Sequence, residues 1–161
     1  MLANHNRNIS DRLIRTIESK AQELTQATTQ KLQSSPLTTS YHRLSPGDLH
    51  DRVYSVYNEL GCWLWEKSND AVRAWYNGLG AKRCDEDIPL AELLWALVIT
   101  KDRLLDHLAA YGLVDTAVEL YRQQEFDRLI GHFFDRAMCY AAEGYARRAS
   151  SMGKTSPAML H

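Results

Sequence analysis

Two groups of acidic and histidine side chains have a spacing that would let them share one face of a helix. Asp102, Asp106 and His107 lie close together, with the two aspartates four residues apart, and His132 and Asp135 are three residues apart. Such groups could perform acid–base chemistry, and a small helical enzyme that uses Asp102, Asp106 and His107 is one alternative. Charges at these spacings more often form a solvated helix face than a reaction centre. We therefore predict no catalytic residues and expect that the protein is not an enzyme.

Metal and phosphate sites lack their sequence signatures. The three cysteines, Cys62, Cys84 and Cys139, are far apart and form no CxxC pair, so we predict reduced, partly buried thiols and no zinc site. No histidine follows a glutamate by three positions, which excludes the paired motif of di-iron bundles. Motifs of the HExxH, Walker, GxGxxG and GxSxG types do not occur either.

Haem binding is the main cofactor alternative, because an all-helical chain can hold haem through a histidine on an inward face. His107 and His132 both fall in predicted helices, but a lone helical histidine is more often a surface or core residue than an axial ligand. We predict no cofactor, and keep a haem-binding or other cofactor-carrying globin-like sensor as the alternative. Tryptophans could line a pocket but are more often core residues: Trp63, Trp65, Trp75 and Trp95.

Composition excludes several classes of partner. The 161 residues suggest one domain, and 45% hydrophobic residues are enough for a core. A net charge of −1 argues against nucleic acid and anionic membranes as partners. The most apolar run, 90–99, is about half the length that a spanning helix needs, and the N-terminus does not resemble a signal peptide. We expect a cytoplasmic protein that does not enter a membrane.

Apolar residues recur at helical spacing through most of the chain, which predicts an all-α bundle of about five helices. Ser45 and Pro46 mark the start of one helix, Asn69 or Asp70 can cap another, and Asp115 can cap the last. The expected helices cover 9–32, 46–64, 69–84, a segment from Pro89 to the YGLVD stretch at 111–115, and 116–148. Residues 1–149 would form one domain, followed by a disordered tail over 150–161.

The helical periods also predict which side chains are buried and which helices have apolar surface left over. Leu94 and Leu97 should both be buried, and Gly61 should let a neighbouring helix approach closely. The first and last expected helices have more apolar surface than one small bundle needs, which favours a homodimer. The predicted interface residues are Ile14, Ile17, Phe133 and Phe134. In the alternative arrangement, the first helix covers this surplus within one chain.

Three stretches together resemble a known family. They are SYHRLSPGDLHDRVYSVYNELGCWL (40–64), LGAKRCDEDIPLAELLWALVITKDRLLDHL (79–108) and FDRLIGHFFDRAMCYAAEGY (126–145). The combination is similar to the N-terminal domain of the RsbR-type RsbT co-antagonist proteins of the bacterial stressosome, over roughly residues 9–147. The resemblance is a pattern of helical packing and contains no catalytic signature.

The resemblance implies a globin-like sensory domain that lacks haem and tends to dimerise. In the family this domain precedes a STAS domain, which binds kinase partners, whereas the present sequence stops soon after its last helix. We therefore expect a free-standing sensory or regulatory domain. It would bind a protein partner or a small ligand in bacterial signalling or stress response.

Overall fold

The computed structural model describes residues 2–66, 68–111 and 116–153, whose regular secondary structure is helical throughout. The all-α class expected from the sequence is confirmed for these residues. No strand occurs among them. The α-helices are α1 (Leu2–Ser19), α2 (Ala21–Ser34), α3 (Pro46–Asn58), α4 (Asn69–Asp85), α5 (Leu90–Tyr111) and α6 (Ala117–Ser151), with a 3₁₀ helix, η1 (Thr39–Arg43), and a π-helix, η2 (Cys62–Glu66).

Hydroxyl side chains cap three of these helices at their N-termini. Ser45 caps α3, Ser68 caps α4 and Thr116 caps α6, each accepting a hydrogen bond from the backbone N–H three residues further along. The prediction at Ser45 is confirmed. The cap of α4 lies one or two residues before the predicted Asn69 or Asp70, because the serine is the residue with extended backbone angles.

The first predicted helix, 9–32, is two helices that meet at Lys20. Lys20 leaves helical geometry at φ −104° and ψ 7°, and its N–H donates to the carbonyl groups of Thr16 and Ile17. No glycine or proline marks this break in the sequence. At the other end, α6 continues to Ser151, two residues past the predicted domain boundary. The predicted cap Asp115, residues 112–115 of the YGLVD stretch and most of the predicted tail, from 154 on, lie outside the described residues.

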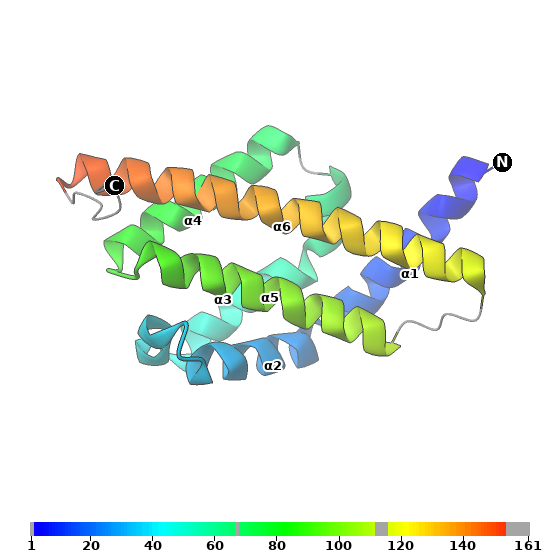
Figure 1. Ribbon diagram of the computed structural model, residues 1–161, viewed down its shortest axis with the longest axis horizontal. Helices are drawn as coiled ribbons and strands as arrows, with labels where there is room; N and C mark the ends of the chain where they lie inside the picture. The colour runs from blue at the N-terminus through cyan, green and yellow to red at the C-terminus, as the bar shows by residue number, and fades with distance from the viewer. Residues whose placement is uncertain (1, 67, 112–115, 154–161) are drawn as a thin grey trace, which may run out of the picture.

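α5 lies at the centre of the arrangement (Figure 1). It runs antiparallel to α6, and it also contacts α2 on one side and α4 on the other. α2 packs mainly on α3, whereas α4 packs mainly on α6. α5 therefore joins an α2–α3 pair to an α4–α6 pair, and this leaves α3 and α4 on different sides of it.

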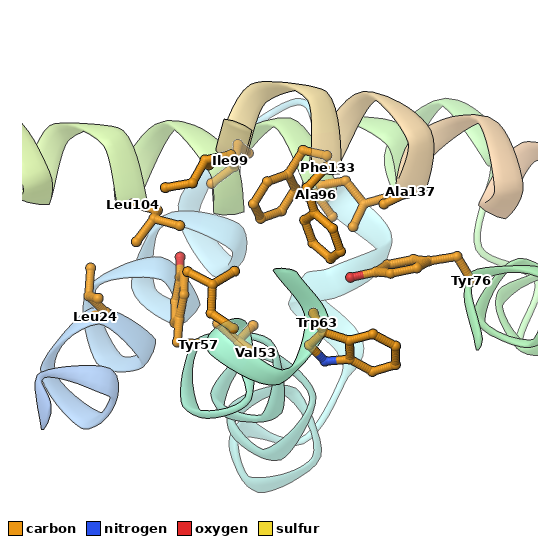
Figure 2. Packing of buried hydrophobic residues seen from close by; sticks show 14 of the residues in the cluster. Leu24, Val53, Tyr57, Trp63, Tyr76, Ala96, Ile99, Leu104, Phe133 and Ala137 are labelled. Atoms are coloured by element: carbon orange, nitrogen blue, oxygen red, sulfur yellow. The ribbon is translucent and has the colours of Figure 1, made fainter. Parts of the chain in front are cut away.

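The apolar core follows α5 and extends into both pairs, as Figure 2 shows for part of it. Leu97 is buried as predicted, but Leu94 is only half-buried, so the prediction for Leu94 was wrong. Glu92, the single charge between residues 90 and 99, accepts hydrogen bonds from the backbone N–H of Ser40 at 2.6 Å and from the hydroxyl of Thr39 at 3.1 Å. The apolar run therefore uses its one carboxylate to hold the start of η1.

Glycines allow two close helix contacts. A Cβ atom at Gly61 would lie 2.7 Å from Cγ2 of Ile14, which confirms the predicted close approach. The tighter contact joins α4 to α6, where a Cβ at Gly80 would lie 2.8 Å from the backbone nitrogen of Tyr145 and a Cβ at Gly144 would collide with the backbone of Asn77. α4 and α6 consequently touch backbone to backbone.

Exposed apolar side chains are concentrated at the beginning of α6, where Val118, Leu120 and Tyr121 are about half exposed or more. Val118 lies in the first turn of α6, outside the packed part of the bundle. Among the described residues, no helix has the length and apolar character needed to cross a membrane.

Candidate functional site

A cleft of about 530 Å³ separates α3 from α4, with part of α5 as its floor. Its size falls within the usual range of small-molecule sites, which are also mostly apolar. α3 and α4 supply the walls, and residues from α2 and η1 close one side. Its apolar lining residues include Leu32, Leu49, Val53, Val56, Trp75, Leu79, Leu93, Ala96 and Leu97.

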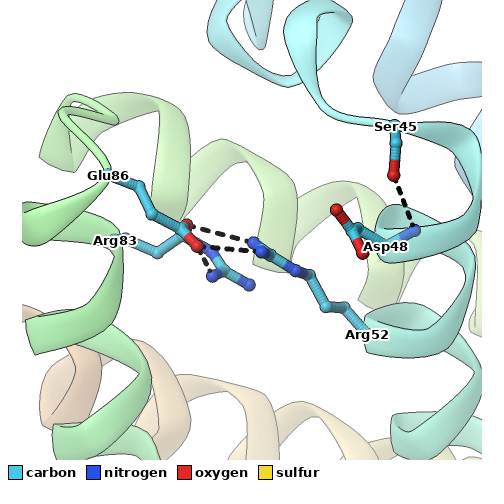
Figure 3. Close-up of polar contacts among 5 residues, drawn as sticks. All are labelled: Ser45, Asp48, Arg52, Arg83 and Glu86. Carbon is cyan, nitrogen blue, oxygen red and sulfur yellow. Dashed lines mark hydrogen bonds and ion pairs between the residues drawn. The ribbon is translucent and has the colours of Figure 1, made fainter.

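One end of the cleft holds two arginines that share a single carboxylate (Figure 3). Arg52 of α3 donates from Nη1 and Nη2 to the two carboxylate oxygens of Glu86, at 3.1 and 2.8 Å. Arg83 of α4 donates from Nη1 to Oε2 of the same glutamate, at 2.9 Å. Both arginines line the cleft, and Arg83 is only 3% exposed. The group of Arg52, Arg83 and Glu86 therefore has a net charge of +1.

Local sequence explains how these charges meet. The N-cap at Ser45 fixes the start of α3, and Arg52 lies two turns further along. α4 ends at Asp85, after which Asp87 has a positive φ of 56°, a conformation that aspartate tolerates better than most residues. This turn holds Glu86 over the last turn of α4, three residues after Arg83.

The electrostatics of the arginine end favour the ionised carboxylate. Burial opposes ionisation of Glu86, but the hydrogen bonds from Arg52 and the charge of Arg83 outweigh burial and lower the pKa of Glu86. The buried hydroxyl of Tyr41 also lines the cleft, and burial raises the pKa of this phenol even though the Arg83 guanidinium lies beside it. The phenol therefore stays neutral and can serve as a hydrogen-bond donor.

Tyr76, which precedes Arg83 by two turns of α4, also lines the cleft. Tyr76 is 1% exposed, and its hydroxyl has no hydrogen-bond partner among the described residues. Figure 2 shows this hydroxyl pointing from α4 toward the centre of the core cluster. Burial raises the pKa of Tyr76 far above its usual value, so the phenol is neutral. Trp75 lies beside it, 52% exposed, with its ring centroid 5.4 Å from that of Trp63.

The acidic and histidine groups singled out in the sequence lie outside this cleft. Asp102 and Asp106 are exposed, as are His132 and Asp135, which agrees with a solvated helix face. His107 is half-buried, and burial lowers its pKa. Within the described ranges, no three His, Cys, Asp or Glu side chains are placed to hold a metal ion. Since neither histidine lines the cleft, haem binding gains no support there, and its predicted absence stays a prediction.

The four predicted interface residues are in the core of the single chain. Ile14 is 6% exposed, while Ile17, Phe133 and Phe134 are 1% exposed or less. The Phe133 ring packs edge-on against Phe134, with ring centroids 5.4 Å apart, and against Tyr76. Their proposed role at a surface is therefore corrected. α1 contacts α2, α3, α5 and α6 and so covers part of the apolar surface within one chain.

The tryptophans divide between the core and the surface. Trp63 is buried, but Trp75, which was predicted to point inward, and Trp95 are both about half exposed. The side chain of Trp65 lies outside the described residues. Of the described tryptophan side chains, only Trp75 lines the cleft, so a pocket built mainly of tryptophan is not found.

The sequence reasoning missed the polar residues of the cleft. Tyr76 and Arg83 are seven positions apart and so lie on one face of α4, together with Leu79. An arginine that continues the apolar face of a helix, instead of its polar face, was the available signal. Arg52 in α3 continues the face of Leu49 and Val56 in the same way.

The chain was compared with protein-family models, with curated proteins and with solved structures, and none of these comparisons found a match.

Proposed function

We propose that this protein is a sensory or regulatory domain that binds a small molecule between α3 and α4. The observation that supports the proposal is the cleft of about 530 Å³, which has apolar walls and polar groups at its two ends. Small-molecule sites usually combine a mostly apolar cavity with a few converging polar groups. The proposal assigns no catalytic role. The buried side chains of Tyr41, Tyr76 and Arg83 at the cleft are suited to bind and orient a ligand.

Because of the location of the cleft, ligand binding would affect how the two helix pairs are arranged. α3 belongs to the α2–α3 pair and α4 to the α4–α6 pair, and a ligand between them would contact both. A ligand shifts a conformational equilibrium when it binds one arrangement more tightly than another. Under this proposal, the ligand favours the arrangement in which α3 and α4 are held at the present separation.

The biological setting rests on the family resemblance. Similarity to the N-terminal domain of RsbT co-antagonists supports a globin-like domain in bacterial stress signalling, in the cytoplasm. It also supports a homodimer and a protein partner.

Since Phe133 and Phe134 are buried, a dimer would use another surface, and the exposed apolar residues at the start of α6 are available: Val118, Leu120 and Tyr121. Sedimentation velocity at micromolar concentration tests the dimer, which a monomeric protein would contradict.

Ligand binding can be tested with the neutral apolar fluorophore N-phenyl-1-naphthylamine. We expect saturable binding with one site per chain. Ala96→Leu places three additional carbon atoms in the floor of the cleft and should weaken binding at least tenfold, whereas Ala91→Leu should leave it unchanged. Both positions are in α5, but Ala91 is exposed and does not line the cleft. Alanine and leucine are both good helix formers, so the pair is matched.

A second variant tests the cleft in case the core repacks around the larger side chain of Ala96→Leu. Gly78 lines the cleft, and a Cβ atom there would have no heavy atom within 4 Å, so Gly78→Leu introduces no clash at Cβ. Its control is Gly131→Leu in α6, where a Cβ atom is equally unobstructed. Non-saturable binding to the parent protein would overturn the proposal, and so would equal affinities in all four variants.

A further inference from the structure

We infer that the cleft selects amphipathic molecules with a single negative charge at one end, as an ionised carboxylic acid has. The inference rests on the proposed function and names the chemical class of its ligand. It depends on the charge at the arginine end, on two buried donor atoms that have no hydrogen-bond partner among the described residues, and on the distance between them.

The ion-pair group at the arginine end has one more positive than negative charge. Arg52 and Arg83 share Glu86, which leaves one excess positive charge in a largely buried group. The remaining charged residues of the lining, Asp51 and Lys82, are exposed and of opposite sign, so they do not change this balance. A buried charge is costly unless it is paired, and a monoanion would neutralise this one. A phosphate dianion would leave an excess negative charge instead.

Arg83 has an available donor for such an anion. Its Nη1 binds Glu86, but its buried Nε has no hydrogen-bond partner among the described residues. Nε–H lies on the edge of the guanidinium away from Nη1, and this edge can bind a carboxylate side-on. Arg52 differs, because both of its terminal nitrogens already bind Glu86. Arg83 is therefore the residue that would hold the anionic head group.

A second polar contact is available further along the same helix. Tyr76 precedes Arg83 by seven residues, which corresponds to two turns and about 10 Å along the helix axis. Its neutral, buried hydroxyl has no partner among the described residues and can donate to a ligand oxygen. Between the two lie Leu79 on α4 and apolar residues of the facing helices, including Val53 and Leu97. The ligand would therefore have an acidic head, an apolar body and, about 10 Å from the head, a hydrogen-bond acceptor.

Competition against bound N-phenyl-1-naphthylamine tests the head group. We expect decanoate to displace the fluorophore at pH 7 at a concentration at least tenfold lower than decan-1-ol or decylamine, which have the same chain with a neutral or a cationic head. In Arg83→Gln this preference for the acid should disappear. The matched control is Arg73→Gln, also in α4, whose guanidinium pairs with Glu143 at the surface, away from the cleft.

Arg52→Gln provides a second variant if Arg83→Gln does not fold, because Arg52 is less buried and its loss also removes the excess charge. Equal displacement by the acid, the alcohol and the amine would overturn the inference while the proposed function remains. Failure of the parent protein to bind the fluorophore would overturn the proposed function itself. Persistence of the acid preference in folded Arg83→Gln and Arg52→Gln would also contradict the inference.

The role of Tyr76 is tested with a ligand that has an oxygen near the far end. We expect 9-oxodecanoate to bind several-fold more tightly than decanoate to the parent protein, and equally tightly to Tyr76→Phe. Decanoate itself should bind both proteins alike, since it offers no acceptor to the tyrosine. The same preference for the keto acid in both proteins would remove Tyr76 from the site.

Discussion

The two sides of α4 meet their neighbours in opposite ways. Toward α6, Gly80 faces the backbone of Ala141, and Gly144 faces the backbone of Asn77, so the two helices touch without side chains between them. Toward α3, the same helix presents Tyr76, Leu79 and Arg83 to an open cleft. The absence of a Cβ atom allows close helix packing, whereas long side chains keep helices apart. One helix thus combines a rigid structural contact with a candidate binding surface.

The largest expected effect concerns the glycine contact. Gly80→Leu should destabilise the protein by about 3 kcal/mol or more, because the added side chain would have to displace the backbone of α6. Gly78→Leu, two residues earlier on the cleft side, should stabilise the helix by up to about 1 kcal/mol. Chemical denaturation of the two variants measures the contrast. Equal unfolding midpoints would show that α4 and α6 are not in close contact.

The second prediction compares a closed part of the core with the wall of the cleft. Leu104 is fully buried in α5 and does not line the cleft, whereas Leu97, also in α5, does. Leu104→Ala should cost about 4 kcal/mol through lost burial and a new cavity. Leu97→Ala should cost about 2 kcal/mol, because its side chain already borders open space. If Leu97→Ala is the more damaging of the two, the cleft is closed in solution.

The sequence could predict the helices because their signals are local. The Ser45 cap, the turn before Pro89 and the apolar period of α5 all depend on residues within a few positions of one another. The break at Lys20 has no such signal, since the residues on each side are ordinary helix formers. Both helices contact α3 and α5, but α1 also contacts α6 and α2 also contacts η1. Contacts of this long-range kind are not visible in the sequence.

The candidate site was less accessible to sequence reasoning. A cleft is a space left between helices, and its existence depends on the separation of α3 and α4, which no residue pattern specifies. The prediction of the interface residues was wrong for a related reason. Phe133 and Phe134 point in different directions along α6, and the sequence suggested that one side had to be a surface, but neighbouring helices cover both. The local signals of the site were the spacing of Tyr76 and Arg83 in α4 and the position of Arg52 on the apolar face of α3.

The third prediction compares two buried tyrosines. The Tyr57 hydroxyl lies 2.7 Å from the Thr28 hydroxyl and donates to the Thr100 carbonyl at 2.9 Å, whereas the Tyr76 hydroxyl has no such partner in the described ranges. Tyr57→Phe should cost about 1–3 kcal/mol because it leaves buried polar atoms unpaired. Tyr76→Phe should be neutral or slightly stabilising. A comparable loss in both variants, measured by urea unfolding, would mean that the Tyr76 hydroxyl is hydrogen-bonded in solution.

The last and smallest expected effect is a pH dependence at the arginine end of the cleft. The arginines hold the folded-state pKa of Glu86 below its ordinary value of 4.5 despite burial, so folding favours the ionised carboxylate. Its contribution to stability is fully present above about pH 4.5 and is lost as the pH falls through the lower folded-state pKa. Arg52 and Arg83 then face each other without a counterion.

The comparison that isolates this contribution uses two glutamate-to-glutamine variants. Glu143 pairs with Arg73 at the surface, where ion pairs contribute little, so Glu143→Gln should follow the parent protein's stability between pH 7 and pH 3. Glu86→Gln should be less stable than the parent at pH 7, by on the order of 1 kcal/mol, and the difference should shrink below pH 4.5. Unfolding free energies measured across this range test the prediction. A constant difference between Glu86→Gln and the parent would show that folding does not shift the ionisation of Glu86, and the excess positive charge proposed for the cleft would then need another source.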